Sequence, residues 1–230
     1  MKPIAHIRCD LKCKFGVPRQ ARLVEDLEAS VVFVPEYRNP EALRGLEDFS
    51  HLWLIWDFSE SHREKWSPTV RPPRLGGNKR MGVFATRSPF RPNPIGLSAV
   101  KLERIEYEGP DAPIIYIKGA DLMDGTPIFD IKPYLPFVDS IPEASNGFAE
   151  DTRRQEELVL EMPDEIAAFF KANLTDNQQA SLFAILKSDP RPRFHDDDGR
   201  EYAFEFADVH VSFAVSDGKI VVKSANLKKY

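Results

Sequence analysis

A run of arginines, hydroxyl side chains and prolines at residues 81–98, MGVFATRSPFRPNPIGLS, has the residue types of a binding site. Arg87 and Arg91 carry guanidinium groups that can pair with carboxylates or phosphates. Each proline fixes its own backbone and favours extended geometry in the residue before it. Because an apolar run precedes the prolines and a strand-like pattern follows from Ile95, we interpret the segment as a stiff cationic loop between two strands. A rigid connection without a ligand is the alternative.

The charge distribution points to a polyanionic partner. The net charge of the chain is −5, yet residues 71–104 carry +7 and the remainder −12. A basic segment in an acidic protein suits a localised contact with nucleic acid, whereas a solvated loop with incidental charge is the simpler explanation. The basic residues are Arg71, Arg74, Lys79, Arg80, Arg87, Arg91, Lys101 and Arg104.

Residues 87–98, RSPFRPNPIGLS, resemble the signature of the TsaA-like family, known in bacteria as TrmO or YaeB. The similarity extends over nearly the whole chain, through GVPRQ (16–20), LEDFSHLWLIWDF (46–58), DLMDGTPIFDIKPYLP (121–136) and DPRP (189–192). Members of that family are S-adenosylmethionine-dependent tRNA methyltransferases that form homodimers. The resemblance therefore implies S-adenosylmethionine as cofactor, tRNA as partner and a single β-barrel as the catalytic fold.

The resemblance also implies positions for the cofactor site. These are Pro18, Arg19, Gln20, His62, Arg63, Arg87, an apolar wall at Leu97, and Asp121, Leu122, Met123 and Asp124. The methyl acceptor in the family is N6 of threonylcarbamoyl-adenosine, next to the anticodon. For its threonine carboxylate, Arg91 or Arg80 could provide a bidentate partner. Arg71, Arg74 and Lys79 are expected to contact tRNA from a proline- and glycine-rich loop at residues 67–79.

The acceptor nitrogen is a weak nucleophile because its lone pair is delocalised into the purine and the carbonyl. Loss of its proton should accompany attack, and this requires a base. Asp121, Asp124 and Asp130 are the candidate bases, and the sequence does not rank them. A non-catalytic RNA-binding barrel and a small-molecule methyltransferase on the same fold remain as alternative functions.

The pattern of elements predicts a mainly β protein in two parts. Short strands with frequent turns up to about residue 140 indicate a β-barrel, which we assign to residues 1–145. Residues 51–58, HLWLIWDF, are apolar at nearly every position and predict a strand covered on both faces. Helices at 163–174 and 175–187, a strand region at 202–213 and a hairpin turn at 216–219 indicate a small α+β domain over 146–230.

Several classes of protein are disfavoured because the sequence lacks their motifs. The chain has neither G-x-G-x-x-G after a strand nor a P-loop, so a Rossmann-type methyltransferase is not supported. Cys9 and Cys13 stand alone without the further ligands of a zinc site, and we expect two reduced thiols and no metal. No segment has the length of a membrane span and none resembles a secretory signal, so we expect a cytoplasmic protein.

Overall fold

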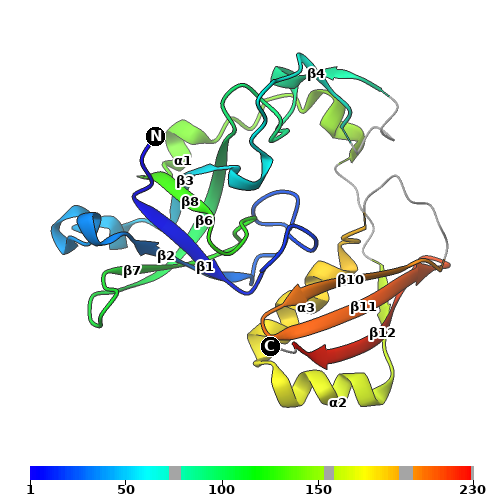
Figure 1. Cartoon of the computed structure of the whole chain (residues 1–230). Coiled ribbons are helices and arrows are strands. Elements are labelled where there is room, and N and C mark those ends of the chain that lie inside the picture. Colours follow the sequence, from blue (N-terminus) through cyan, green and yellow to red (C-terminus); the bar gives the residue numbers. More distant parts are fainter. Residues whose placement is uncertain (73–78, 153–157, 192–198, 229–230) are drawn as a thin grey trace.

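The computed structural model describes residues 1–72, 79–152, 158–191 and 199–228. Six strands close into a barrel in the order β1-β2-β7-β6-β3-β8, with every neighbouring pair antiparallel (Figure 1). This architecture confirms the prediction of a mainly β protein with a barrel core. The strands are β1 Ala5–Cys9, β2 Glu28–Phe33, β3 His51–Asp57, β6 Ile95–Glu106, β7 Ile114–Lys118 and β8 Pro127–Pro133.

Every second side chain of a strand points into the barrel and fills its interior. On β1, Ala5, Ile7 and Cys9 are buried while the residues between them are exposed, as a strand with one core face requires. The prediction that β3 is covered on both faces was wrong: Leu52, Leu54 and Trp56 are buried, and the residues between them are only partly so. The apolar residues on the outer face of β3 include Trp53, whose ring packs on Tyr134.

Short elements lie between the strands. The 3-10 helices η1 Pro35–Tyr37, η2 Pro40–Leu43 and η3 Leu46–Asp48 precede β3, and η4 Ser59–Ser61 follows it. The strands β4 Thr69–Val70 and β5 Met81–Gly82 pair as a ribbon, and η6 Val83–Ala85 leads from β5 into the proline-rich loop. We call β4, β5 and η6, with Trp66 just before them, the arm (Figure 1). The apolar run before the loop is therefore a helical turn, and part of the expected loop at 67–79 is strand β4.

The C-terminal part is a four-stranded sheet with two helices. Its strand order is β10-β11-β12-β9, and β9 runs parallel to β12. The predicted helices are present, and Thr175 begins α3 with a capping box to Gln178. Asp217 and Gly218 take positive φ in the predicted hairpin turn. The elements are α1 Pro136–Asp139 and η7 Gly147–Thr152 in the connection, then β9 Val159–Glu161, α2 Asp164–Asn173, α3 Asp176–Lys187, β10 Glu201–Phe206, β11 Val209–Ser216 and β12 Lys219–Leu227.

The connection between β1 and β2 is packed against the C-terminal part. Phe15 stacks with Tyr202 and Phe213, with ring centroids 6.1 and 6.3 Å apart. Asp10 accepts a hydrogen bond from Gln178 (2.9 Å), and Leu11 forms a β-bridge with Phe206. The C-terminal part therefore holds the segment that carries residues 17–20.

Candidate active site

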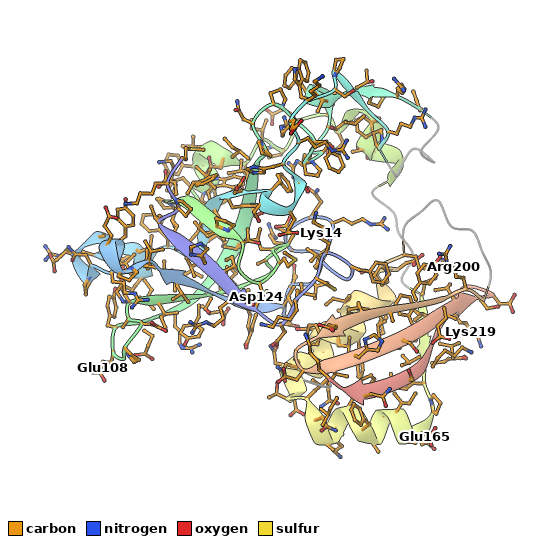
Figure 2. The ribbon with its side chains drawn as sticks, viewed as in Figure 1. Lys14, Glu108, Asp124, Glu165, Arg200 and Lys219 are labelled. Atoms are coloured by element: carbon orange, nitrogen blue, oxygen red, sulfur yellow. The ribbon has the colours of Figure 1, made fainter. Side chains whose placement is uncertain are left out.

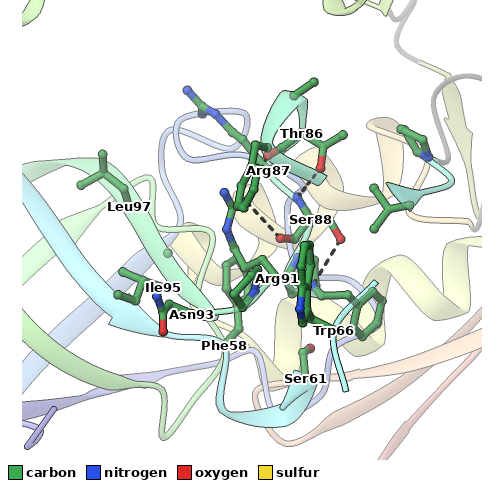
Figure 3. Close-up of a pocket in the computed structure, with 18 of the residues that line it drawn as sticks. Phe58, Ser61, Trp66, Thr86, Arg87, Ser88, Arg91, Asn93, Ile95 and Leu97 are labelled. Atoms are coloured by element: carbon green, nitrogen blue, oxygen red, sulfur yellow. Dashed lines mark hydrogen bonds between the residues drawn. The ribbon is translucent and has the colours of Figure 1, made fainter. Parts of the chain in front are cut away.

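A pocket of about 1780 Å³ opens beside the barrel, where segments distant in sequence converge. The β1–β2 connection contributes residues 17–20, β6 contributes Ile95 to Leu97, and the proline-rich loop and the arm form another wall. In the view of Figure 3, Ile95 and Leu97 lie on one side, Trp66 lies on the other, and Arg91 lies between them. The pocket thus combines an apolar strand surface with a polar loop.

The pocket has a strong cationic bias. Among its described lining residues, the acidic side chains are Glu64 and Asp121. Basic side chains outnumber these acidic ones. A surplus of positive charge in a concave site raises the local concentration of anions and favours their binding. The basic lining residues are Arg19, Arg63, Lys65, Arg71, Arg80, Arg87 and Arg91.

Internal hydrogen bonds fix the shape of the proline-rich loop. The Thr86 hydroxyl donates to the Val83 carbonyl (2.8 Å) and accepts from the backbone N–H of Ser88 (3.2 Å). The Arg91 guanidinium donates to the Thr86 carbonyl (3.0 Å), as Figure 3 shows for the residues of this loop. Arg63 lies over the Phe90 ring, with its Cζ 3.6 Å from the ring centroid. The loop is therefore held in one shape by its own side chains as well as by its prolines.

Arg87 links the loop to the β1–β2 connection. Its Nη1 donates to Gln20 Oε1 at 2.5 Å, and Gln20 Nε2 donates to the Arg19 carbonyl at 2.6 Å. Arg19 in turn donates to the carbonyl of Arg191 at 2.7 Å. The structure thus brings together Arg19, Gln20 and Arg87, three of the residues expected at the cofactor site.

Asp121 is held by a chain of two hydrogen bonds from the barrel wall. Trp56 Nε1 donates to Ser98 Oγ (3.0 Å), and Ser98 donates to Asp121 Oδ1 (2.5 Å). Because an indole N–H can only donate, the Ser98 proton is directed to the carboxylate. Gly96 allows Trp56 to lie flat on β6, since a Cβ there would come within 2.1 Å of the indole.

The protonation of Asp121 is shifted by its surroundings. Burial raises the pKa of its carboxyl above the ordinary value, while the Ser98 hydrogen bond, backbone hydrogen bonds and the charge of Arg87 oppose the rise. A carboxylate with a raised pKa in a pocket is a stronger base than an exposed one.

The other two candidate bases lie outside the pocket lining. Asp124 accepts from the backbone N–H of Cys9 (2.9 Å) and pairs with Lys12 (3.0 Å), so it anchors the end of β1 (Figure 2). Asp130 pairs with Lys132 at 2.9 Å on β8. Of the three aspartates, Asp121 is the one that lines the pocket.

Other expected site residues are also outside the lining. Leu122 is buried in the core, and Met123 accepts through its carbonyl from Thr126. His62 bonds Asp57 at 2.7 Å, next to the pocket residues Ser61 and Arg63. Lys79 is exposed and does not line the pocket, and Arg74 lies outside the described residues. By contrast Pro18, Arg63, Leu97, Arg71, Arg80 and Arg91 all line it.

The sequence reasoning missed several lining residues. Ser98 is the last residue of the recognised signature, yet the pattern assigned it no function. The aromatic side chains Trp66, Phe84, Phe90 and Phe148 line the pocket, and the sequence pattern assigned none of them to the site. An aromatic residue within a polar, loop-forming stretch is the signal that could have identified them.

Neither a metal cluster nor a membrane helix is found in the part of the chain that the structure describes. No group of three or more histidine, cysteine, aspartate or glutamate side chains there could hold a metal ion. No described helix is long and apolar enough to cross a bilayer.

Comparison with solved structures defines the class of protein. A crystal structure of TrmO from Pseudomonas aeruginosa superimposes with a TM-score of 0.76 at 32% identity, covering 98% of this chain and 95% of that one. The chain is therefore a two-part β-barrel protein of the kind seen in TrmO, and not a doubly wound α/β protein.

Sequence comparisons give the particular family. The family model of the tRNA-methyltransferase O N-terminal domain matches residues 6–140, and that of the TrmO C-terminal domain matches residues 155–227. A protein of Escherichia coli (strain K12) named tRNA (adenine(37)-N6)-methyltransferase is 43% identical, over 93% of this chain and 92% of its own length. A probable S-adenosyl-L-methionine-binding protein of Pyrococcus abyssi is 38% identical, over 79% and 90%. The chain belongs to the tRNA-methyltransferase O family, which confirms the resemblance.

Proposed function

We propose that this protein transfers a methyl group from S-adenosylmethionine to N6 of threonylcarbamoyl-adenosine at position 37 of tRNA. The observation that carries the proposal is the pocket, where Asp121 and the Arg87–Gln20 pair lie within one cationic lining. Family membership and the names of the relatives support the reaction class. We place the protein in the cytoplasm, in keeping with its proposed tRNA substrate.

The residues of the pocket fit the cofactor chemically. A guanidinium at Arg87 or Arg19 suits the carboxylate of an amino acid, and the exposed side chains of Ile95 and Leu97 offer an apolar wall. Pro18, Gln20 and Arg63 line the same pocket. When bound, the cofactor supplies an activated methyl group on a sulfonium. Of residues 121–124, Asp121 lines this region. We extend the proposed cofactor site to Leu122, Met123 and Asp124 of the same turn, and to His62 next to Arg63, because the family resemblance implies them.

Asp121 is the proposed general base. Its Oδ1 accepts a hydrogen bond from Ser98, and the carboxylate is the group proposed to take the N6 proton. Ser98 and Trp56 position the carboxylate, because the chain of two hydrogen bonds fixes its orientation from the barrel wall.

An arginine is proposed to bind the threonine carboxylate of the substrate. Arg91 already donates through Nη1 to the carbonyls of Thr86 and Ser88, whereas Arg80 is exposed at the pocket edge. Each remains a candidate, and the Arg91 interactions predict that Arg91 also maintains the loop. Arg71 is proposed to contact tRNA phosphates, with Lys79 and Arg74 near it in the sequence.

The decisive experiment compares two tRNA substrates with radiolabelled cofactor. We expect methyl transfer to tRNA that carries threonylcarbamoyl-adenosine and transfer slower by about two or more orders of magnitude to an unmodified transcript, since the carboxylate is absent. Arg80→Ala and Arg91→Ala are compared on both substrates, and the variant of the arginine that binds the carboxylate should lose more rate on the modified tRNA than on the unmodified transcript. Equal wild-type rates on the two substrates would contradict the assignment. Absence of transfer to any RNA, with binding intact, would favour a non-catalytic barrel.

We also propose that the protein is a homodimer, as the family resemblance implies. Phe137 on α1 is 85% exposed, and Val138 and Ile141 beside it are exposed as well. Apolar side chains clustered on a surface mark interaction sites, and a second copy of the chain is the occupant we propose.

A further inference from the structure

The arm presents two aromatic rings to the pocket with large exposed surfaces. The exposed fractions of Trp66 and Phe84 are 52% and 74%, although both side chains line the pocket. Their ring centroids are 6.2 Å apart with an interplanar angle of 31°. Aromatic side chains usually bury most of their surface, and exposed ones beside cations suit the stacking of flat ligands.

Cationic side chains surround this pair. Lys65 precedes Trp66 directly, Arg71 follows β4 and Arg80 precedes β5, and all three line the pocket. Arg80 reaches Thr69 of the arm at 3.5 Å. Aromatic faces interleaved with basic groups are what a single-stranded nucleic acid requires, because bases stack and phosphates need compensating charge.

The size of the pocket leaves space for such a ligand. Sites for one small molecule are typically about 300–1,000 Å³, whereas this pocket has about 1780 Å³. Gln20, Arg87, Leu97 and Asp121 account for the cofactor and the reacting base. The arm side, with Trp66 and Phe84, is not required for either.

We propose that Trp66 and Phe84 form a stacking platform for a nucleobase of the tRNA anticodon loop other than the methylated adenine. The inference rests on the proposed function, because that function supplies the RNA. Recognition of loops commonly uses unstacked bases placed on aromatic side chains. The platform holds the strand beside the target, so that the target adenine reaches Asp121.

Binding of a fluorescently labelled anticodon stem-loop RNA, measured at several salt concentrations, tests the platform. Trp66→Ala and Phe84→Ala are expected to weaken binding about 5- to 150-fold, with an unchanged salt slope because no charge is lost. Trp66→Phe keeps a ring and should bind nearly as the wild type does. Arg71→Gln should instead lower the salt slope.

Two controls separate stacking from misfolding and from cofactor loss. Tyr107→Ala removes another exposed aromatic residue, outside the pocket, and should leave RNA binding unchanged. Cofactor affinity, measured by calorimetry, should be unchanged in Trp66→Ala and Phe84→Ala.

The outcomes distinguish this inference from the proposed function. Wild-type RNA affinity in both alanine variants, with methyl transfer intact in the wild type, would overturn the platform alone. A parallel loss of cofactor affinity would also overturn it, since the rings would then belong to the cofactor site. Wild-type protein that binds RNA through Trp66 and Phe84 but transfers no methyl would overturn the function and keep the platform. No RNA binding by the wild type would overturn both.

Discussion

At the scale of single residues, Asp121 couples activity to stability. Its carboxyl is partly buried, and this burial raises its pKa, so the ionised form that a base requires destabilises the folded chain. Active sites commonly retain such unfavourable groups because the reaction needs them.

Asp121→Asn should therefore lower methyl transfer by about 10²-fold or more and raise the free energy of unfolding at neutral pH. The amide still accepts the Ser98 hydrogen bond but carries no charge. Because the folded pKa lies above the unfolded one, wild-type stability falls as pH rises through the interval between them. The stability advantage of the variant should thus shrink on acidification and disappear below both pKa values. Chemical denaturation over a pH series measures this, and an undiminished transfer rate in Asp121→Asn would exclude the residue as the base.

At the scale of elements, the turn at Gly16 places the residues of the β1–β2 connection at the pocket. Gly16 has a φ of +97°, and a Cβ there would lie 2.7 Å from the Phe204 ring of β10. The C-terminal part therefore determines where Pro18, Arg19 and Gln20 lie.

Gly16→Ala should lower the free energy of unfolding by about 1–3 kcal/mol and weaken cofactor binding, because the turn must move away from Phe204. Gly109→Ala is the matched control, since Gly109 has a φ of +110° with nothing within 4 Å of an added Cβ. The control should lose stability through backbone strain alone and keep its cofactor affinity. Calorimetric titration of both variants with the cofactor tests this. Equal cofactor affinities in the two variants would show that the Gly16 turn does not position the cofactor site.

At the scale of the whole molecule, α1 is the surface proposed to join two copies. Phe137→Asp places a charge where an apolar contact is proposed, and it should weaken dimerisation by about tenfold or more. Phe137 is exposed in the single chain, so the monomer should remain folded. Sedimentation equilibrium measures the dissociation constant, and a monomeric wild type would contradict the proposal.

The sequence alone determined most of the elements of this protein. Alternation at Ala5, Ile7 and Cys9 predicted β1, and the pair Asp217-Gly218 predicted a hairpin. A proline followed by acidic residues predicted α2, and the spacing of apolar residues predicted α3. These signals are local, because the repeat of a strand or helix is visible within a few residues. The recognised signature likewise identified the family, since its residues are contiguous.

The tertiary structure decided which side chains share the pocket. Asp121, Asp124 and Asp130 are indistinguishable in the sequence, yet Asp121 is the one whose carboxylate accepts a hydrogen bond from Ser98 of β6. Likewise Trp66 meets Phe84 only because β4 pairs with β5. The direction of a side chain in an irregular segment depends on contacts between distant parts of the chain, and no local repeat encodes those contacts.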